Sequence, residues 1–247
     1  MINLKTEKEI ALMAETGNIL AQTMKKLEEE IRPGISAESL DRLAESLLLK
    51  YGGCCSFKGY QDFPACLCVS LNNEIVHAPP SGRLLKEGDI VSLDLGFFYQ
   101  GFHSDMAVTV PVGRVDPEAL RLIEVTEEAL KAGIAAIEPG KTIGNISQAI
   151  QTYVEKQGFS VIRDLCGHGI GKALHEEPEI LNYGKKSNSP EIRPGMVFCL
   201  EPMVSCGSPE IVRARDGFTF KTVDNSLSAH FEHTVAVTEK EILILTQ

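Results

Sequence analysis

The sequence contains no tryptophan and no long apolar run. Its first ten residues, MINLKTEKEI, lack the apolar stretch of a secretory signal peptide. No segment approaches the ~20 consecutive apolar residues that are needed to span a bilayer. These absences predict a cytoplasmic protein that does not interact with a membrane.

Positive charge is also scarce, because 24 Lys and Arg stand against 34 Asp and Glu, giving a formal net charge of −10. Binding to a phosphate backbone needs clustered Lys and Arg, so we do not expect nucleic acid to be a partner. Either an acidic, solvated surface or a set of carboxylates that holds a divalent metal would explain the excess of Asp and Glu over Lys and Arg.

The seven cysteines do not form a recognisable zinc motif or an even set. Cys54-Cys55 and Cys66-Val-Cys68 lack the Cys-x(2–4)-Cys spacing that structural zinc sites prefer. An odd number without a secretory signal favours reduced thiols. We expect most of these cysteines to be small buried apolar side chains.

A weak internal repeat divides the chain. Pro33-Gly34 matches Pro139-Gly140 at an offset of 106 residues. Asp94 stands six residues after Gly88, as Glu201 stands six after Gly195, at an offset of 107. The shared offset predicts one domain, 1–247, made of related halves at about 1–113 and 114–247.

Each half begins with helical signals and continues with strands. Thr6 to Glu9 has the pattern of a capping box, and Asp116-Pro117 is typical of a helix start. Apolar, β-branched segments follow, among them IVSLDLGFF and MVFCLEPMV. This order predicts an α+β fold with outer helices, a mostly antiparallel sheet and a cleft between the halves.

Two aspartates interrupt apolar strands of the first half. Asp94 lies in IVSLDLGFF and Asp105 in GFHSDMAVTV. If the strands form a hairpin that turns at Tyr99-Gln100, the two aspartates face each other directly, ~5 Å apart at Cβ. A shared proton or a cation would then have to offset their repulsion. The alternative is a solvent-exposed hairpin face with two ordinary acids.

The second half of the chain also contains residues of the types that bind metal ions. Glu201 and Glu232 interrupt apolar strands there, and His168 lies between the two pairs of acids in CGHGIGKALHEEP. This glycine-rich segment lacks the spacing of a phosphate-binding loop or a dinucleotide fingerprint. Four carboxylates and one imidazole fit two divalent cations, as in two-metal hydrolytic sites.

At these residues the chain resembles the type I methionine aminopeptidases of the two-fold-symmetric pita-bread metallopeptidases. The resemblance is carried by the ordered segments NNEIVHAPP, SLDLG, GFHSD, GHGIG, HEEP, LEPM and FEHT. Only thirty residues separate Glu201 from Glu232, which leaves no room for the helical insert of type II enzymes.

The resemblance implies two divalent metal ions, Co, Mn, Fe, Zn or Ni, held by five ligands. They are Asp94, Asp105, His168, Glu201 and Glu232, with Asp105 and Glu232 bridging. It also implies that Glu201 is the proton-shuttling base and that His77 and His175 contact the substrate. Taken alone, either histidine would be read as an ordinary core residue.

The resemblance further implies an apolar pocket for a methionine side chain. By position, Tyr60, Phe63, Cys68 and Phe218 contribute to it, with Phe57 and Leu174 nearby. Phe218 stands where Trp is usual in the family, Leu174 where an aromatic residue is frequent, and Ala78 where Gly is common. These departures bear on fine specificity.

The implied function is removal of the N-terminal methionine from nascent proteins and peptides with a small second residue. The implied partners are nascent polypeptide N-termini near the ribosome, and we expect a monomer. The alternative is an X-Pro aminopeptidase or prolidase-like peptidase, since those enzymes share the metal constellation.

Overall fold

The computed structural model describes residues 1–184 and 189–247. Helix α1 (Glu7–Glu29) begins with the predicted capping box, in which Thr6 and Glu9 bond each other's backbone N–H groups. Helix α3 (Pro117–Ala135) begins at Asp116, whose side chain accepts from the N–H of Glu118. Both helix starts were predicted correctly because capping depends on local sequence alone.

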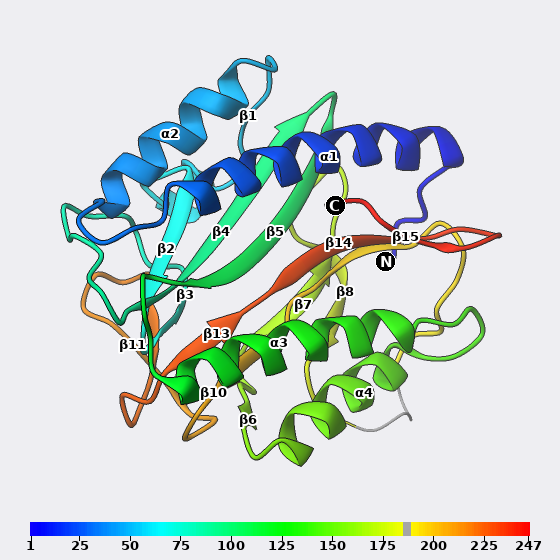
Figure 1. Cartoon of the computed structure of the whole chain (residues 1–247). Helices are drawn as coiled ribbons and strands as arrows, with labels where there is room; N and C mark the ends of the chain where they lie inside the picture. The colour runs from blue at the N-terminus through cyan, green and yellow to red at the C-terminus, as the bar shows by residue number, and fades with distance from the viewer. Residues whose placement is uncertain (185–188) are drawn as a thin grey trace.

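The helices lie in two pairs, one for each half of the chain. Helix α1 and α2 (Ala37–Leu49) cross the upper half of the molecule in Figure 1, and α3 and α4 (Ile143–Lys156) cross the lower half. Leu20, Leu40 and Leu93 belong to the core under the first pair. Leu122 and Phe198 belong to the core under the second.

A nine-stranded sheet joins the two halves in the order β1-β4-β5-β14-β9-β7-β8, with β2 paired to β4 and β15 paired to β14. Its strands are β1 (Cys54–Cys55), β2 (Leu67–Leu71), β4 (Ile90–Tyr99), β5 (Phe102–Pro111), β7 (Cys166–Gly169), β8 (Glu176–Leu181), β9 (Val197–Leu200), β14 (Glu232–Val237) and β15 (Ile242–Ile244). All of its pairings in the described residues are antiparallel. The α+β architecture with outer helices agrees with the prediction.

Two three-stranded sheets flank the large one. The first has the order β13-β10-β6 and the second β11-β12-β3. Their strands are β3 (Glu74–Val76), β6 (Ser160–Val161), β10 (Met203–Ser205), β11 (Ile211–Arg213), β12 (Phe220–Thr222) and β13 (Ser228–His230). A single 3-10 turn, η1 (Tyr60–Asp62), precedes β2.

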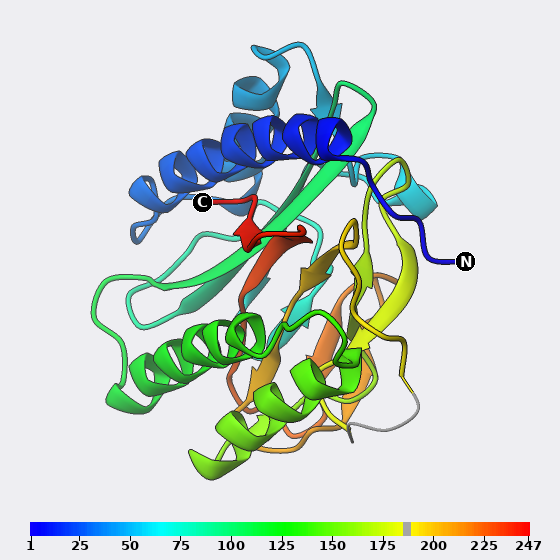
Figure 2. The ribbon, with the colours of Figure 1, turned by 90° about the vertical axis from the view of Figure 1, so that its right-hand side faces the viewer.

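The C-terminal end of the chain lies against α1 (Figure 2). A Cβ atom at Gly17 of α1 would lie 2.3 Å from the carbonyl oxygen of Leu245. Only glycine permits this approach, so Gly17 fixes how closely α1 meets the end of the sheet.

The segments that match in sequence also make matching backbone bonds. The N–H of Gly34 donates to Leu85 O, and the N–H of Gly140 donates to Ile192 O. The isolated bridges Ser36–Leu84 and Thr142–Glu191 correspond in the same way. This correspondence supports our proposal of two halves with a boundary near residue 113.

The hairpin of β4 and β5 turns one residue later than expected. Gln100 and Gly101, with φ of 50° and 88°, occupy the turn, and Tyr99 pairs with Phe102. A two-residue turn of this kind needs positive φ at both central positions, and Gly supplies one of them without strain. Asp94 therefore pairs with Ala107 and Asp105 with Gly96, so the predicted direct pairing of the two aspartates is wrong.

The expectation of reduced thiols is also wrong for one pair. Cys55 and Cys66 form a disulfide, while the other five cysteines are free. Cys68 and Cys199 are buried, as expected of small apolar side chains, whereas Cys54 is exposed. In the described residues, no helix has the length and apolar character to cross a membrane.

Candidate metal centre

A row of paired residues crosses the large sheet and places acids on one face. Cys68 of β2 pairs with Asp94 of β4, Asp94 with Ala107 of β5, and Ala107 with Glu232 of β14. Directly paired residues point to the same side of a sheet, so these side chains share one face. The small Ala107 leaves room between the carboxylates of Asp94 and Glu232.

Asp105 joins the same face two residues along β5 from Ala107. One carboxylate oxygen from each of Asp94, Asp105 and Glu232 lies within 4.8 Å of the others, and all three residues are buried. The register differs from the predicted one by two residues, and a slip of two preserves the face. Hence the two aspartates still meet, as diagonal rather than direct neighbours.

Glu201 and His168 approach this cluster from β9 and β7. Glu201 follows the last residue of β9 and precedes Pro202, where the chain leaves one sheet for another. The Nε2 atom of His168 lies 3.6 Å from Oε1 of Glu201. The sequence placed Glu201 within one continuous strand, whereas it lies between β9 and β10, because Pro202 has no N–H for the ladder.

The hydrogen bond of His168 defines which of its two ring nitrogens carries the proton. Nδ1 lies 2.9 Å from the carbonyl oxygen of Gly169, which can only accept, so Nδ1 donates and Nε2 keeps its lone pair. A hydrogen bond from the ring nitrogen that does not bind metal orients a metal-binding imidazole. Burial, followed by the neighbouring His175, lowers the pKa of His168 to about 3, so the imidazole is neutral at pH 7.

The buried carboxyls have the opposite shift. Burial raises the pKa of Asp94. Burial raises the pKa of Asp105 further, with the charges of Glu232 and Asp94 adding to it. Burial and nearby carboxylates likewise raise the pKa of Glu201 and of Glu232. Mutually repelling acids of this kind need protons or cations to remain buried.

Several carboxylate oxygens at the centre have no hydrogen-bond donor among the described residues. They are Asp94 Oδ1, Asp105 Oδ1 and Glu232 Oε1. Buried polar atoms without a partner are costly and rare, unless an ion or water satisfies them. Together with the free Nε2 of His168, they form the mixed O/N donor set that suits a first-row divalent metal.

A cavity of about 550 Å³ opens onto this cluster. It is bounded by every residue that the sequence assigned to the site: Phe57, Tyr60, Phe63, Cys68, His77, Asp94, Asp105, His168, Leu174, His175, Glu201, Phe218 and Glu232. Ala78 is buried and does not border it. The structure thus brings the metal-ligand and pocket residues to a single place.

The two further histidines lie on the walls of the cavity. Nδ1 of His175 lies 2.8 Å from the hydroxyl of Tyr60, and the His175 ring is 4.3 Å from that of His168. His77 has a φ of 59° and its ring packs 5.8 Å from Phe220. Burial lowers the pKa of both, that of His77 to about 4 with His175 and Arg213 contributing.

Sequence reasoning missed Cys199 and His230. The thiol of Cys199 lies within 4.8 Å of ligand atoms of His168 and Glu232. The buried His230 ring has Nε2 3.8 Å from Glu201 and 3.9 Å from Glu232. The available signal was their place in the sequence, since each lies two residues before an assigned ligand.

Comparison with known proteins gives the family. The model of metallopeptidase family M24 matches residues 11–239. The chain belongs to this family. It is accordingly a metal-dependent peptide hydrolase, and the predicted family resemblance is confirmed.

The relatives cover the whole chain. "Methionine aminopeptidase 1" of Bacillus subtilis is 47% identical over 247 residues, covering all of both chains. The crystal structure of the Thermotoga maritima methionine aminopeptidase matches with a TM-score of 0.98 and 43% identity, again over both full chains. The predicted pita-bread fold is thereby confirmed.

The fold extends to a more distant enzyme. The prolidase of Pyrococcus horikoshii matches 99% of this chain and 63% of that chain, with a TM-score of 0.78 and 22% identity. At that identity the likeness shows the shared fold and nothing about the substrate.

Proposed function

We propose that this protein removes the N-terminal methionine from polypeptides by metal-assisted hydrolysis. The observation that carries the proposal is one cavity in which buried, unsatisfied carboxylates adjoin an apolar aromatic wall. The full-length similarity to proteins named methionine aminopeptidase supports the same substrate.

We assign two divalent cations to five ligands, Asp94, Asp105, His168, Glu201 and Glu232, with Asp105 and Glu232 shared. The central position of Asp105 and Glu232 in the strand order β4-β5-β14-β9 supports the shared role. The ions are Co, Mn, Fe, Zn or Ni, all of which accept carboxylate and imidazole ligands. When bound, they supply Lewis acidity that lowers the pKa of a water molecule.

The remaining steps, proton transfer and stabilisation of the developing negative charge, are assigned to protein side chains. Glu201 accepts the proton of the attacking water, since it borders the same cavity as the other acids and a carboxylate can take up and pass on a proton there. His175 and His77 donate hydrogen bonds to the scissile carbonyl oxygen as negative charge develops on it. Both histidines line the cavity that holds the acids.

The apolar wall binds the methionine side chain. The Phe63 ring packs edge-on against Phe218 at 5.5 Å and against Phe57 at 6.5 Å. Tyr60 and Cys68 complete the wall. Burial raises the pKa of the Cys68 thiol well above its usual range, so it remains neutral beside a thioether.

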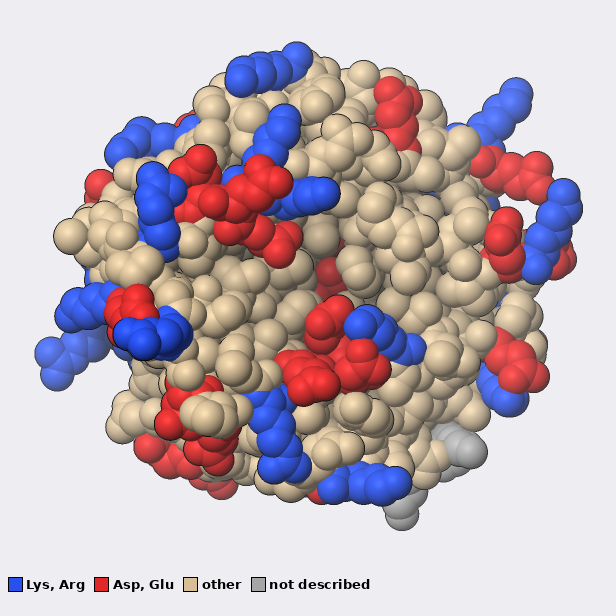
Figure 3. Space-filling model, in the orientation of Figure 1, with Lys and Arg blue, Asp and Glu red and all other residues tan. Residues whose placement is uncertain are grey.

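We place the enzyme in the cytoplasm as a monomer that acts on nascent chain N-termini near the ribosome and prefers a small second residue. Acidic and basic side chains are interspersed on the face in Figure 3, and the net charge is −10, which does not favour nucleic acid as a partner.

Product analysis tests the proposal. The metal-free protein, reloaded with each cation in turn, is incubated with Met-Gly-Met-Met and with an X-Pro peptide. We expect methionine release from the first only, and only with metal. Hydrolysis confined to the X-Pro peptide would replace the assignment by the prolidase-like alternative.

A further inference from the structure

The Cys55–Cys66 disulfide lies outside the metal centre but closes the loop that forms part of the apolar wall. Cys55 ends β1 and Cys66 directly precedes β2. The segment 56–65 between them contributes Phe57, Tyr60 and Phe63 to the cavity. The disulfide therefore joins the two ends of a substrate-binding loop.

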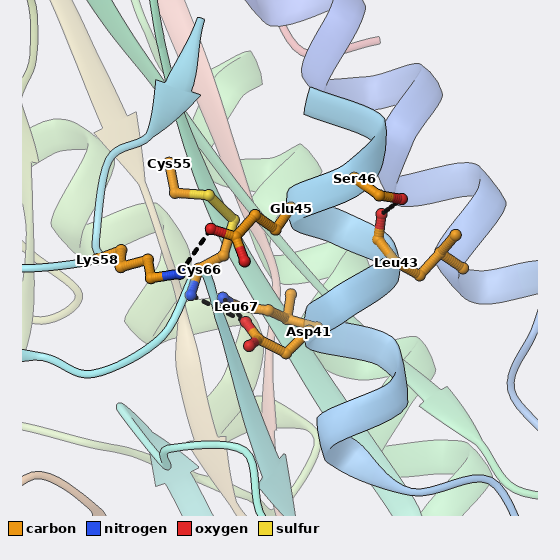
Figure 4. Close-up of a disulfide and its surroundings, with 8 residues drawn as sticks. All are labelled: Asp41, Leu43, Glu45, Ser46, Cys55, Lys58, Cys66 and Leu67. Atoms are coloured by element: carbon orange, nitrogen blue, oxygen red, sulfur yellow. Dashed lines mark hydrogen bonds and ion pairs between the residues drawn. A yellow bond between two sulfur atoms is a disulfide. The ribbon is translucent and has the colours of Figure 1, made fainter. Parts of the chain in front are cut away.

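Noncovalent contacts also hold the two ends of this loop, because β1 and β2 both pair with β4. Figure 4 shows the carboxylate of Asp41 in α2 accepting from the N–H groups of Cys66 and Leu67, at 2.9 and 3.0 Å. Lys58 and Glu45 form an ion pair at 2.6 Å, with the Lys58 side chain 49% exposed. An exposed pair of this kind contributes little, and the disulfide adds a covalent restraint to the Asp41 hydrogen bonds and the strand pairing.

The backbone of the loop needs such a restraint. Gln61 and Asp62 adopt φ of 46° and 65°, in the left-handed region that residues other than glycine seldom occupy. Such conformations persist only where the surroundings enforce them. On the inner side, that enforcement includes the 2.8 Å contact between Tyr60 and His175.

We propose that the Cys55–Cys66 pair is a thiol-modification site whose redox state controls binding of the substrate's first side chain. With the disulfide formed, segment 56–65 is held in the conformation that presents Phe57, Tyr60 and Phe63. With the bond reduced, that conformation is less populated and substrate binds more weakly. The inference rests on the proposed function for the identity of the bound side chain.

The two sulfur atoms differ in access. Cys55 is partly exposed, whereas Cys66 is fully buried, so a thiolate of a dithiol reductant attacks Sγ of Cys55. The S–S bond breaks and Cys66 leaves as a thiolate that takes a proton. The second thiol of the reductant then displaces Cys55, which is also protonated. The protein gains two electrons and two protons, and the reductant becomes a disulfide.

Reduction should raise the KM of methionyl peptides by about threefold or more, while kcat changes less. The apparent affinity falls in proportion to the population of the competent loop. The metal ligands lie on strands of the large sheet or next to them, so their geometry is retained.

The experiment uses metal-loaded protein purified without reductant, compared before and after treatment with a water-soluble phosphine. Thiol titration of the denatured protein should give five thiols before reduction and seven after it. Hydrogen exchange of segment 56–65, binding of free methionine and the KM of Met-Gly-Met-Met are measured on both forms. Cys55→Ser/Cys66→Ser should match the reduced form without phosphine, and Cys55→Ala provides a second variant if the double one fails to fold. Cys54→Ser is the control, because this exposed thiol takes no part in the bond.

Faster exchange in segment 56–65 together with weaker methionine binding supports the proposal. Seven thiols under oxidising conditions, or equal exchange and equal methionine affinity in both forms, would overturn it. If neither form cleaves any methionyl peptide, the proposed function fails. Hydrogen exchange of segment 56–65 and the thiol titration then still decide whether the Cys55–Cys66 disulfide controls the loop.

Discussion

The hydroxyl of Tyr60 lies 2.8 Å from Nδ1 of His175 and joins the loop before β2 to the turn before β8. When the hydroxyl donates, Nδ1 accepts and Nε2 carries the proton. That tautomer is the one required of a donor to the carbonyl oxygen of the substrate. Tyr60 thus borders the cavity and, in the proposed mechanism, orients the histidine that donates to the substrate.

Tyr60→Phe should lower kcat about fivefold, the equivalent of one hydrogen bond of about 1 kcal/mol. In a His175→Ala background, the same change should have almost no further effect on kcat, because the two residues act together. Steady-state kinetics on the four proteins of the cycle provide the test. Tyr51→Phe, on the exposed surface, serves as the control. Additive losses in the double variant would contradict the coupling.

The cluster of acids could be predicted from sequence, but the hairpin register could not. Asp94 and Asp105 stood out because carboxylates are unusual in apolar strands. Their exact partners depended on which two residues form the turn, and Gln100-Gly101 differs from the predicted turn by one position. The error moved the pairing by two residues, so the prediction of a common face survived.

Contacts between segments that belong to different strands could not be predicted from the sequence. The pairing of Cys55 with Cys66 requires that β1 and β2 both flank β4, a relationship that cysteine counting does not contain. His230 and Cys199 reach the centre through the sheet order β5-β14-β9 and the strand break at Phe231. Helix caps, in contrast, involve neighbours two or three residues apart and were predicted correctly.

Among residues 1–184 and 189–247, two groups of side chains could hold a metal, and each group leads to a different prediction. One is Asp94, Asp105 and Glu232, and the other is His168, Cys199 and Glu232. Asp105→Asn should reduce bound metal and lower kcat/KM by more than about 100-fold, since it removes the charge of a proposed ligand. Metal analysis of the purified variant, alongside kinetics, measures both effects.

Cys199→Ala should retain metal and most of the activity. Its thiol lies 3.6 Å from Thr234 Oγ1, and burial beside Glu232 and Asp105 raises its pKa well above the usual range, so in the metal-free protein it is a neutral thiol whose ionisation costs more than that of a carboxyl. A thiol binds metal as the thiolate. If Cys199→Ala lost its metal while Asp105→Asn kept it, the metal would have to be assigned to the group that contains Cys199.

Metal binding should release protons near neutral pH. The carboxyls of Asp105, Glu201 and Glu232 have raised pKa values in the metal-free protein and so retain protons that a cation must displace. Affinity for the cation should therefore fall as the pH is lowered. Calorimetric titration at pH 7 in buffers of different ionisation enthalpy counts the protons, and a buffer-independent enthalpy would show that none is released.

His230 should position Glu201 from behind the metal centre. Its Nε2 lies 3.8 Å from Glu201 Oε2, and in the described residues neither ring nitrogen has a hydrogen-bond partner. His230→Leu, which keeps the bulk but removes the polar ring nitrogen, should lower kcat by less than about tenfold, because a polar contact at 3.8 Å contributes less than a hydrogen bond to a charged group. His230→Gln places an amide near the Nε2 position and should restore most of the activity. Equal kinetics for both variants would remove the positioning role, and thermal unfolding would reveal a merely structural effect.

The ion pair of Lys5 and Glu176 should control the stability of the turn that carries His175. Lys5 Nζ lies 2.7 Å from Glu176 Oε2, with side-chain exposures of 5% and 7%. Breaking a buried pair leaves one charge uncompensated, so Lys5→Met should lower the free energy of unfolding by about 3 kcal/mol at pH 7. Lys8→Met, on the exposed side of α1, is the matched control.

The pH dependence of this pair has a definite sign. Burial alone would raise the pKa of Glu176, but hydrogen bonds from Lys5 and the N–H of Ala173 outweigh it and hold the pKa below its ordinary value of 4.5. A carboxyl with a lowered pKa in the folded state stabilises the protein fully above that ordinary value. The contribution is lost as the pH falls through the lowered pKa. Urea unfolding of the metal-free protein should therefore show a gap between wild type and Lys5→Met that is wide at pH 7 and narrows below about pH 4.5. A gap that is independent of pH would mean that Lys5 stabilises the fold through the packing of its alkyl chain rather than through its charge.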